Sequence, residues 1–382
     1  MASNYDWLPD HHLGAVGALA HADELIAQAG DLLFTYQVES GNVIELREQS
    51  DGLVNQLIVE SLLPIPRKLT LVVADAMVAL RGVLEHTLFA EIEHRDGLLG
   101  DEWARLVEMP ATLNHKGFEE WRKRRERKGP PSLAADGDVM RAIESLQPFQ
   151  HQLRPAEHPL ARLTVHTNHS KHRKQALAAV LLPVVYREDR IPRSFAELEK
   201  RPERPLELGE VIFTAPVGEV APLSLNPTVG LNRPNTNDWP ILMHELRDIA
   251  DWVRKQAVPR LITCGDLPAS ELPARFDISL GYSDERLAIA GGSHTSAVSR
   301  QTDRLVAASA RLDLVDLFGL VPGAPGPEQI GRWLSQLSDK QVIERVDRLE
   351  VFKGLSSASS SKRALDVLGD MLTEALDFLK AP

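Results

Sequence analysis

The run Leu69-Thr-Leu-Val-Val-Ala-Asp-Ala-Met-Val-Ala-Leu-Arg-Gly-Val-Leu-Glu-His-Thr-Leu88 decides the fold class. Its aliphatic residues recur at steps of three and four, which is the period of an amphipathic α-helix. Pro66 stands just before this run, where a proline is tolerated at a helix start. We therefore predict a long helix over residues 67–94.

The same periodicity predicts a mainly α protein. Further helices are expected at residues 15–36, 117–128, 136–150, 159–178 and 238–255. Aliphatic runs separated by Pro- and Gly-rich turns predict a small antiparallel β insertion at about 179–230. The residue pattern of the sequence changes near 261–268, so we place a boundary between a domain at 1–262 and a mostly helical C-terminal domain at 263–382. Within the latter, residues 276–282 and 286–290 are expected to form a short strand pair.

Composition limits the function classes. The chain has 382 residues and a formal net charge of −11, which argues against a general nucleic-acid coat protein but leaves room for a small basic site. Cys264 is the only cysteine, so no internal disulfide forms. The sequence has no secretory signal pattern and no apolar run of roughly 18 residues. We expect a cytoplasmic protein without membrane contact.

Arg81 and His86 carry the first candidate chemistry. A histidine can take a proton from a 2′-hydroxyl, and an arginine offers a fork of donors to a phosphate. No metal or other cofactor is needed for such RNA cleavage. The alternative is structural: Arg81 pairs with Glu85 four residues on, and His86 fills a polar niche. Asp75 and His86 flank a stripe of small residues on which a second helix could pack.

A second polar cluster runs from His166 to Arg173. One interpretation assigns Lys171, His172 and Arg173 to an anion site. Another makes His166, His169 and His172 metal ligands, although adjacent cations oppose it. The third is an ordinary polar helix end.

The stretch Trp121-Arg-Lys-Arg-Arg-Glu-Arg-Lys128 is strongly basic. It could attract RNA or another polyanion. The alternative is a solvated helix face without a ligand.

Three segments together resemble a large, mostly uncharacterised bacterial family. Leu80-Arg-Gly-Val-Leu-Glu-His86 resembles that family's LRSALDH helix, and Ile143-Glu-Ser-Leu-Gln-Pro-Phe149 resembles its segment ending in LQPY or LQPF. His158-Pro-Leu-Ala-Arg-Leu163 with Ser170-Lys-His-Arg173 resembles its HPL and DKHR segment. The resemblance covers about residues 15–260. It departs at Ser170, where the family has aspartate, and at Gly82, where a polar residue is usual.

That family in turn resembles HEPN helical bundles, many of which are metal-independent ribonucleases of toxin–antitoxin and antiviral systems. The resemblance implies a HEPN-like bundle in which Arg81 binds phosphate and His86 is catalytic, with Asp75 and Glu85 in support and Lys171, His172 and Arg173 holding substrate. It implies a homodimer that cleaves or binds RNA in bacterial defence or stress. A protein partner is expected to bind the C-terminal domain. The alternative function is a non-catalytic scaffold or regulatory protein.

Overall fold

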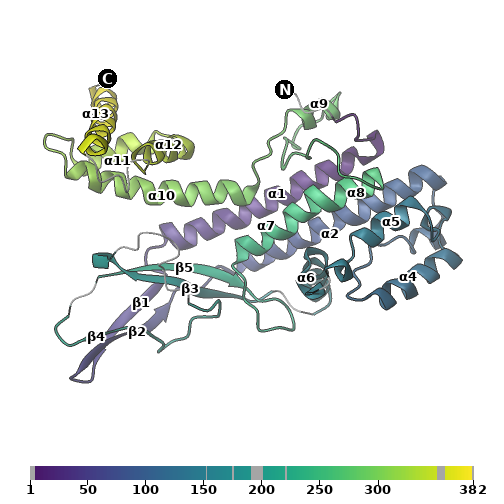
Figure 1. Cartoon of the computed structure of the whole chain (residues 1–382), viewed down its shortest axis with the longest axis horizontal. Coiled ribbons are helices and arrows are strands. Elements are labelled where there is room, and N and C mark those ends of the chain that lie inside the picture. Colours follow the sequence, from purple (N-terminus) through teal and green to yellow (C-terminus); the bar gives the residue numbers. More distant parts are fainter. Residues whose placement is uncertain are drawn as a thin grey trace. The chain divides into compact units, whose positions relative to one another are not determined.

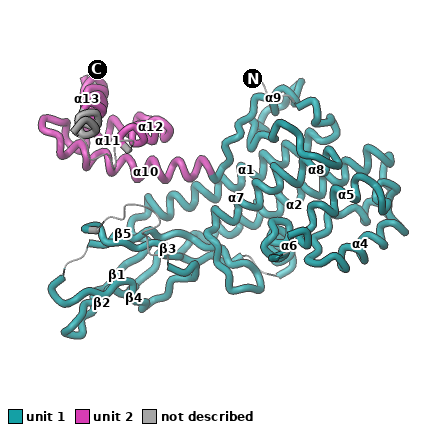
Figure 2. The backbone as a smooth tube through the Cα atoms, in the orientation of Figure 1, with its two compact units in different colours: residues 1–298 teal, residues 299–382 magenta. Residues whose placement is uncertain are grey.

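The computed structural model describes residues 5–151, 153–173, 176–190, 201–219, 222–350 and 358–380. The chain divides into two compact units, residues 1–298 and 299–382 (Figure 2). As expected, the fold is mainly α, with only small antiparallel sheets. Among the described residues, no helix combines the length and the apolar character needed to cross a membrane.

Two long helices form the centre of the first unit. Helix α1 (Leu13–Phe34) and helix α2 (Arg67–Asp96) lie side by side (Figure 1). The residues that predicted α2 line its buried face, and Leu80 and Leu84 are among them. The helix ends where Gly97 adopts a φ of 81°, a left-handed conformation that suits glycine. The expected helix at 67–94 is therefore confirmed.

Shorter helices surround this pair. They are α3 (Asp101–Ala104), α4 (His115–Lys128), α5 (Asp138–Ser145), α6 (Pro159–His172), α7 (Leu242–Trp252), α8 (Val258–Thr263) and α9 (Glu285–Ala290). Helix α6 begins with Pro159 at its first position, where a missing N–H costs nothing, and it packs against both α2 and α7. A π-helical turn, Val253–Ala257, joins α7 to α8.

The β structure is larger than the sequence indicated. Strands β1 (Ile44–Ser50) and β2 (Val54–Leu62) form a hairpin, and β2 also pairs with β4 (Val211–Pro216). Strands β3 (Ala178–Arg187) and β5 (Leu223–Leu231) form a second antiparallel pair. The expected insertion at 179–230 thus contributes strands to two sheets. In one of them, β4 pairs with the β1–β2 hairpin, which was not predicted. At the hairpin turn, Gly52 has a φ of 90°.

The first unit extends beyond the expected boundary at residue 262. Arg254 Nη1 donates to the Leu272 carbonyl at 2.7 Å, and the Ala297 N–H donates to Asp23 Oδ1 at 2.6 Å. These contacts and the burial of Leu272 fasten residues 265–298 to the helical core. The expected strand pair at 276–290 is wrong: residues 285–290 form α9, and only an isolated bridge joins Arg275 to Ser293.

The second unit is helical and has its own core. Its helices are α10 (Ala297–Gly319, which begins two residues before the unit), α11 (Pro327–Ser335), α12 (Asp339–Glu350) and α13 (Ala358–Lys380). Phe318 and Trp333 meet edge to face in this core, beside Val342 and Met371. The core explains how residues 299–382 form a compact body of their own.

Candidate functional site

Arg81 is held in a structural network. Its Nη2 lies 2.5 Å from Glu85 Oε1 and also donates to the Met109 carbonyl. Its Nη1 donates to Thr164 Oγ1 on α6 at 3.2 Å. Glu85 completes the arrangement by accepting the Met109 N–H at 2.8 Å through Oε2. The pair therefore connects α2 to α6 and to the loop at Met109, and only 15% of the Arg81 side chain is exposed.

His86 lies apart from that network. Its side chain is exposed, and among the described residues it shares no hydrogen bond or ion pair with Arg81. Asp75 is also exposed, while Ala79 and Gly82 between them are partly buried. A methyl group added at Gly82 would meet only the His86 ring, at 3.9 Å. The structure thus leaves this stripe of small residues accessible and does not bring Arg81 and His86 to one anion.

The second predicted cluster divides between surface and core. Lys171, His172 and Arg173 are exposed at the end of α6, where Arg173 Nη1 reaches Asn235 Oδ1 at 3.4 Å. His166 faces inward instead, and its Nε2 lies 3.4 Å from Glu245 Oε1. The ligand atoms of His166, His169 and His172 do not lie close enough together to hold one ion. The potential metal cluster found among the described residues lies elsewhere.

Glu245 is the centre of a buried ion network that the sequence did not reveal. Arg162 Nη1 lies 2.6 Å from Oε2, and Arg233 approaches both carboxylate oxygens, at 3.0 and 2.8 Å. Burial alone would raise the pKa of Glu245, but hydrogen bonds from His166 and Arg233 and the charges of the two arginines lower it to about 2. This network joins α6, α7 and the segment after β5.

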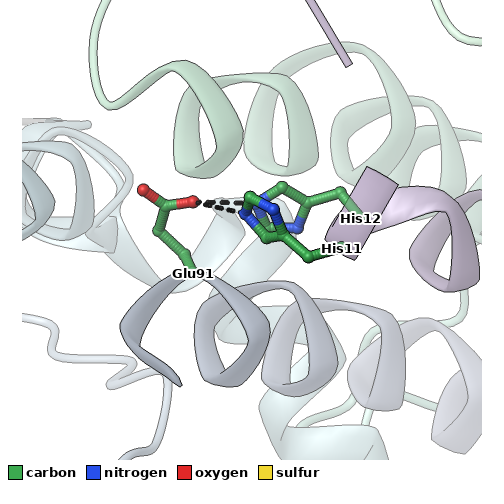
Figure 3. A group of neighbouring side chains, drawn as sticks. All are labelled: His11, His12 and Glu91. Atoms are coloured by element: carbon green, nitrogen blue, oxygen red, sulfur yellow. Dashed lines mark hydrogen bonds and ion pairs between the residues drawn. The ribbon is translucent and has the colours of Figure 1, made fainter. Parts of the chain in front are cut away.

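A third polar cluster connects the N-terminus of the first unit to the end of α2. His11 and His12 precede α1, and both point their Nε2 atoms at Oε2 of Glu91, at 3.3 and 2.9 Å (Figure 3). Glu91 Oε1 accepts instead from Arg95 Nε at 2.5 Å. His11, His12 and Glu91 are the potential metal cluster of the described residues. The adjacent histidines and Glu91 stand far apart in the sequence, so spacing gave no signal for this cluster.

Helix α4 carries a basic surface. Its inner face packs through Phe118, which stacks on Trp121, and through Arg125, which lies over the Trp121 ring and pairs with Glu108. The outer side presents exposed cations, which we call the α4 cation patch: Lys123, Arg124, Arg127 and Lys128. These positions span about 140° of the helix circumference. None of the four forms an ion pair with a described residue.

Comparison with known proteins finds no family model, no curated protein and no solved structure that matches the chain.

Proposed function

We propose that this protein binds RNA electrostatically through the α4 cation patch, as a HEPN-like protein of bacterial defence or stress response in the cytoplasm. The observation that carries the proposal is the accumulation, on one helix of a chain whose net charge is −11, of cations that form no ion pair with the residues that the structure describes. A polyanion that neutralises such a patch releases its own counterions, which favours binding at low salt.

The local arrangement keeps the patch positive. Other cations of the same helix are neutralised, because Arg122 pairs with Glu119 at 2.7 Å and Lys116 approaches Glu120 at 4.0 Å. Burial lowers the pKa of Arg125, and the charge of the neighbouring Arg124 adds a smaller lowering through repulsion between the two guanidinium groups. A bound phosphate chain would relieve this repulsion. The dipole at the C-terminal end of α4 also stabilises cations at these positions.

The aromatic residues of α4 indicate how RNA would be held. Phe118 is fully buried and Trp121 packs against the core, so neither offers an open face for stacking on a base. Binding would depend on backbone phosphates rather than base identity. We therefore propose RNA binding with little sequence preference.

Binding suits the geometry better than cleavage at Arg81 and His86. The Arg81 fork is occupied by Glu85, Met109 and Thr164, whereas a phosphate ligand needs those donors free. A homodimer remains part of the proposal, with the stripe from Asp75 to His86, which is exposed at both ends and partly buried between them, as its contact surface. A protein partner of the second unit also remains an expectation.

A second candidate function is favoured by the ion pair between Arg81 and Glu85. If Arg81 only fastens α2 to its neighbours, the protein could be a non-catalytic scaffold or regulatory protein that binds no RNA. The two candidates differ in whether the α4 cation patch has a ligand.

The test is fluorescence anisotropy of a labelled mixed-sequence single-stranded RNA at 50 mM salt, a concentration at which such contacts are strong. The variant Lys123→Ala/Arg124→Ala/Arg127→Ala/Lys128→Ala should lose at least tenfold in affinity. A control with the same charge change removes exposed cations elsewhere: Arg67→Ala/Lys68→Ala/Lys340→Ala/Lys380→Ala. Equal losses in both variants, or no binding by the unmodified protein, would reject the proposal and leave the scaffold function.

A further inference from the structure

We propose that His11, His12 and Glu91 bind a divalent transition-metal ion, at a site separate from the α4 cation patch. The three residues offer two imidazole nitrogens and one carboxylate oxygen. This donor set suits zinc or iron better than calcium or magnesium, which prefer oxygen ligands alone.

The spacing of the donor atoms fits a coordination polyhedron. Bonds of about 2.0–2.2 Å to nitrogen and oxygen place neighbouring ligand atoms about 3.0–3.4 Å apart. His12 Nε2 and His11 Nε2 lie 2.9 and 3.3 Å from Glu91 Oε2. All three ligand atoms fall within 4.8 Å of one another. An ion could therefore enter with small side-chain adjustments.

The two oxygens of Glu91 have different partners. Arg95 holds Oε1 through its Nε and is itself fixed by Asp138 Oδ1, 2.7 Å from its Nη1. Both imidazoles face Oε2. A ligating carboxylate is commonly oriented in this way, with one oxygen on the metal and the other hydrogen-bonded to a neighbour.

Burial and ring packing fix the imidazoles. His12 is fully buried, and its Nδ1 has no hydrogen-bond partner, so Glu91 is the hydrogen-bonding contact found for this ring among the described residues. The His11 ring stacks on His94, with centroids 4.0 Å apart and planes 12° from parallel. The His11 side chain is 23% exposed, which gives an ion a path from solvent.

The local charge favours a cation. Glu91 and Asp138 contribute two negative charges and Arg95 contributes one positive charge, which leaves these three side chains with a net charge of −1. Cys264 lies nearby but faces Oε1, with Sγ 3.9 Å from that atom. The thiol therefore lies beside the carboxylate oxygen that Arg95 holds, and Cys264 is not included in the ligand set.

The structural alternative is that both imidazoles simply donate N–H groups to Glu91. Titration of the full-length, chelator-treated protein with Co²⁺, followed by its visible absorption, separates the two possibilities because only coordination changes the spectrum. Calorimetry with Zn²⁺ gives the stoichiometry and affinity independently. We expect one ion per chain.

Two variants and one control make the test specific. His11→Ala removes the most exposed ligand, and Glu91→Gln removes the charge with little change in shape; each should weaken Zn²⁺ binding at least tenfold. His21→Ala, an exposed histidine of α1 that approaches Glu24 at 3.7 Å, should bind like the unmodified protein. Circular dichroism verifies the fold of each variant. Failure of the unmodified protein to bind either metal, or full binding by folded His11→Ala, would overturn the site.

Discussion

Arg81 and Glu85, one turn apart on α2, form an ion pair whose Nη2–Oε1 distance is 2.5 Å, and together they hold both backbone polar groups of Met109. A loop between two helices is thereby fastened to the central helix pair. This relationship makes Arg81 a structural residue in the present conformation.

We expect Arg81→Ala to lower the free energy of unfolding by about 1–3 kcal/mol, because the Met109 carbonyl and Glu85 lose their donor in a partly buried setting. His86→Ala, at an exposed position, should change it by less than about 0.5 kcal/mol. Urea unfolding of both variants measures the difference. The structural role of Arg81 fails if its loss leaves stability unchanged.

The Glu245 network should control stability in acid. Its folded-state pKa of about 2 lies below the ordinary value of 4.5, so its contribution is complete above pH 4.5 and is lost as the pH falls toward 2. Glu245→Gln should lower the unfolding free energy by about 3–5 kcal/mol near neutral pH, since Arg162 and Arg233 lose their buried partner. It should also remove this part of the pH dependence. Denaturant titrations from pH 5 to 2 would contradict the network's role if both proteins followed parallel curves.

His158 should affect the stability of the fold in a different pH range. Burial, followed by the charges of His151 and Arg162, lowers its pKa from 6.5 to about 4. The unfolded chain then takes up the proton first, so the folded state loses stability as the pH falls from about 6.5 to 4. His158 accepts the Leu160 N–H at the start of α6, and His158→Asn keeps an acceptor there without titrating. We expect a shallower stability slope in this window for the variant, and an identical slope would refute the assignment.

Two glycines should respond in opposite directions to replacement by alanine. A Cβ at Gly230 would lie 2.7 Å from the Leu181 side chain across the β3–β5 pair, whereas one at Gly17 of α1 would meet nothing within 4 Å. Gly230→Ala should destabilise the protein by about 1–3 kcal/mol, and Gly17→Ala should stabilise it by about 0.5–1 kcal/mol. Thermal unfolding of the two variants tests whether the sheet packs as closely as described.

The sequence predicted those helices whose buried residues recur with a regular local period. The aliphatic face of α2 identified that helix, because a helix buries residues at regular steps. The β1–β2 hairpin was missed even though Asp51-Gly52 marks its turn, because β1 is largely exposed and polar, and β2, although it is rich in aliphatic residues, is mostly only partly buried. The ion pair between Arg81 and Glu85 could be predicted, because residues four positions apart lie next to each other on a helix. The contacts of Glu245 and Glu91 could not be predicted, since they join segments about 80 residues apart through tertiary packing alone.

The salt dependence of RNA affinity tests the central claim most directly. The slope of log K against log salt changes by about 0.7 for each phosphate contact to a single strand. Between 50 and 200 mM salt, we expect the variant lacking the four cations of the α4 cation patch to have a slope shallower by about 2–3 than the unmodified protein. Equal slopes for the two proteins would contradict RNA binding at this helix.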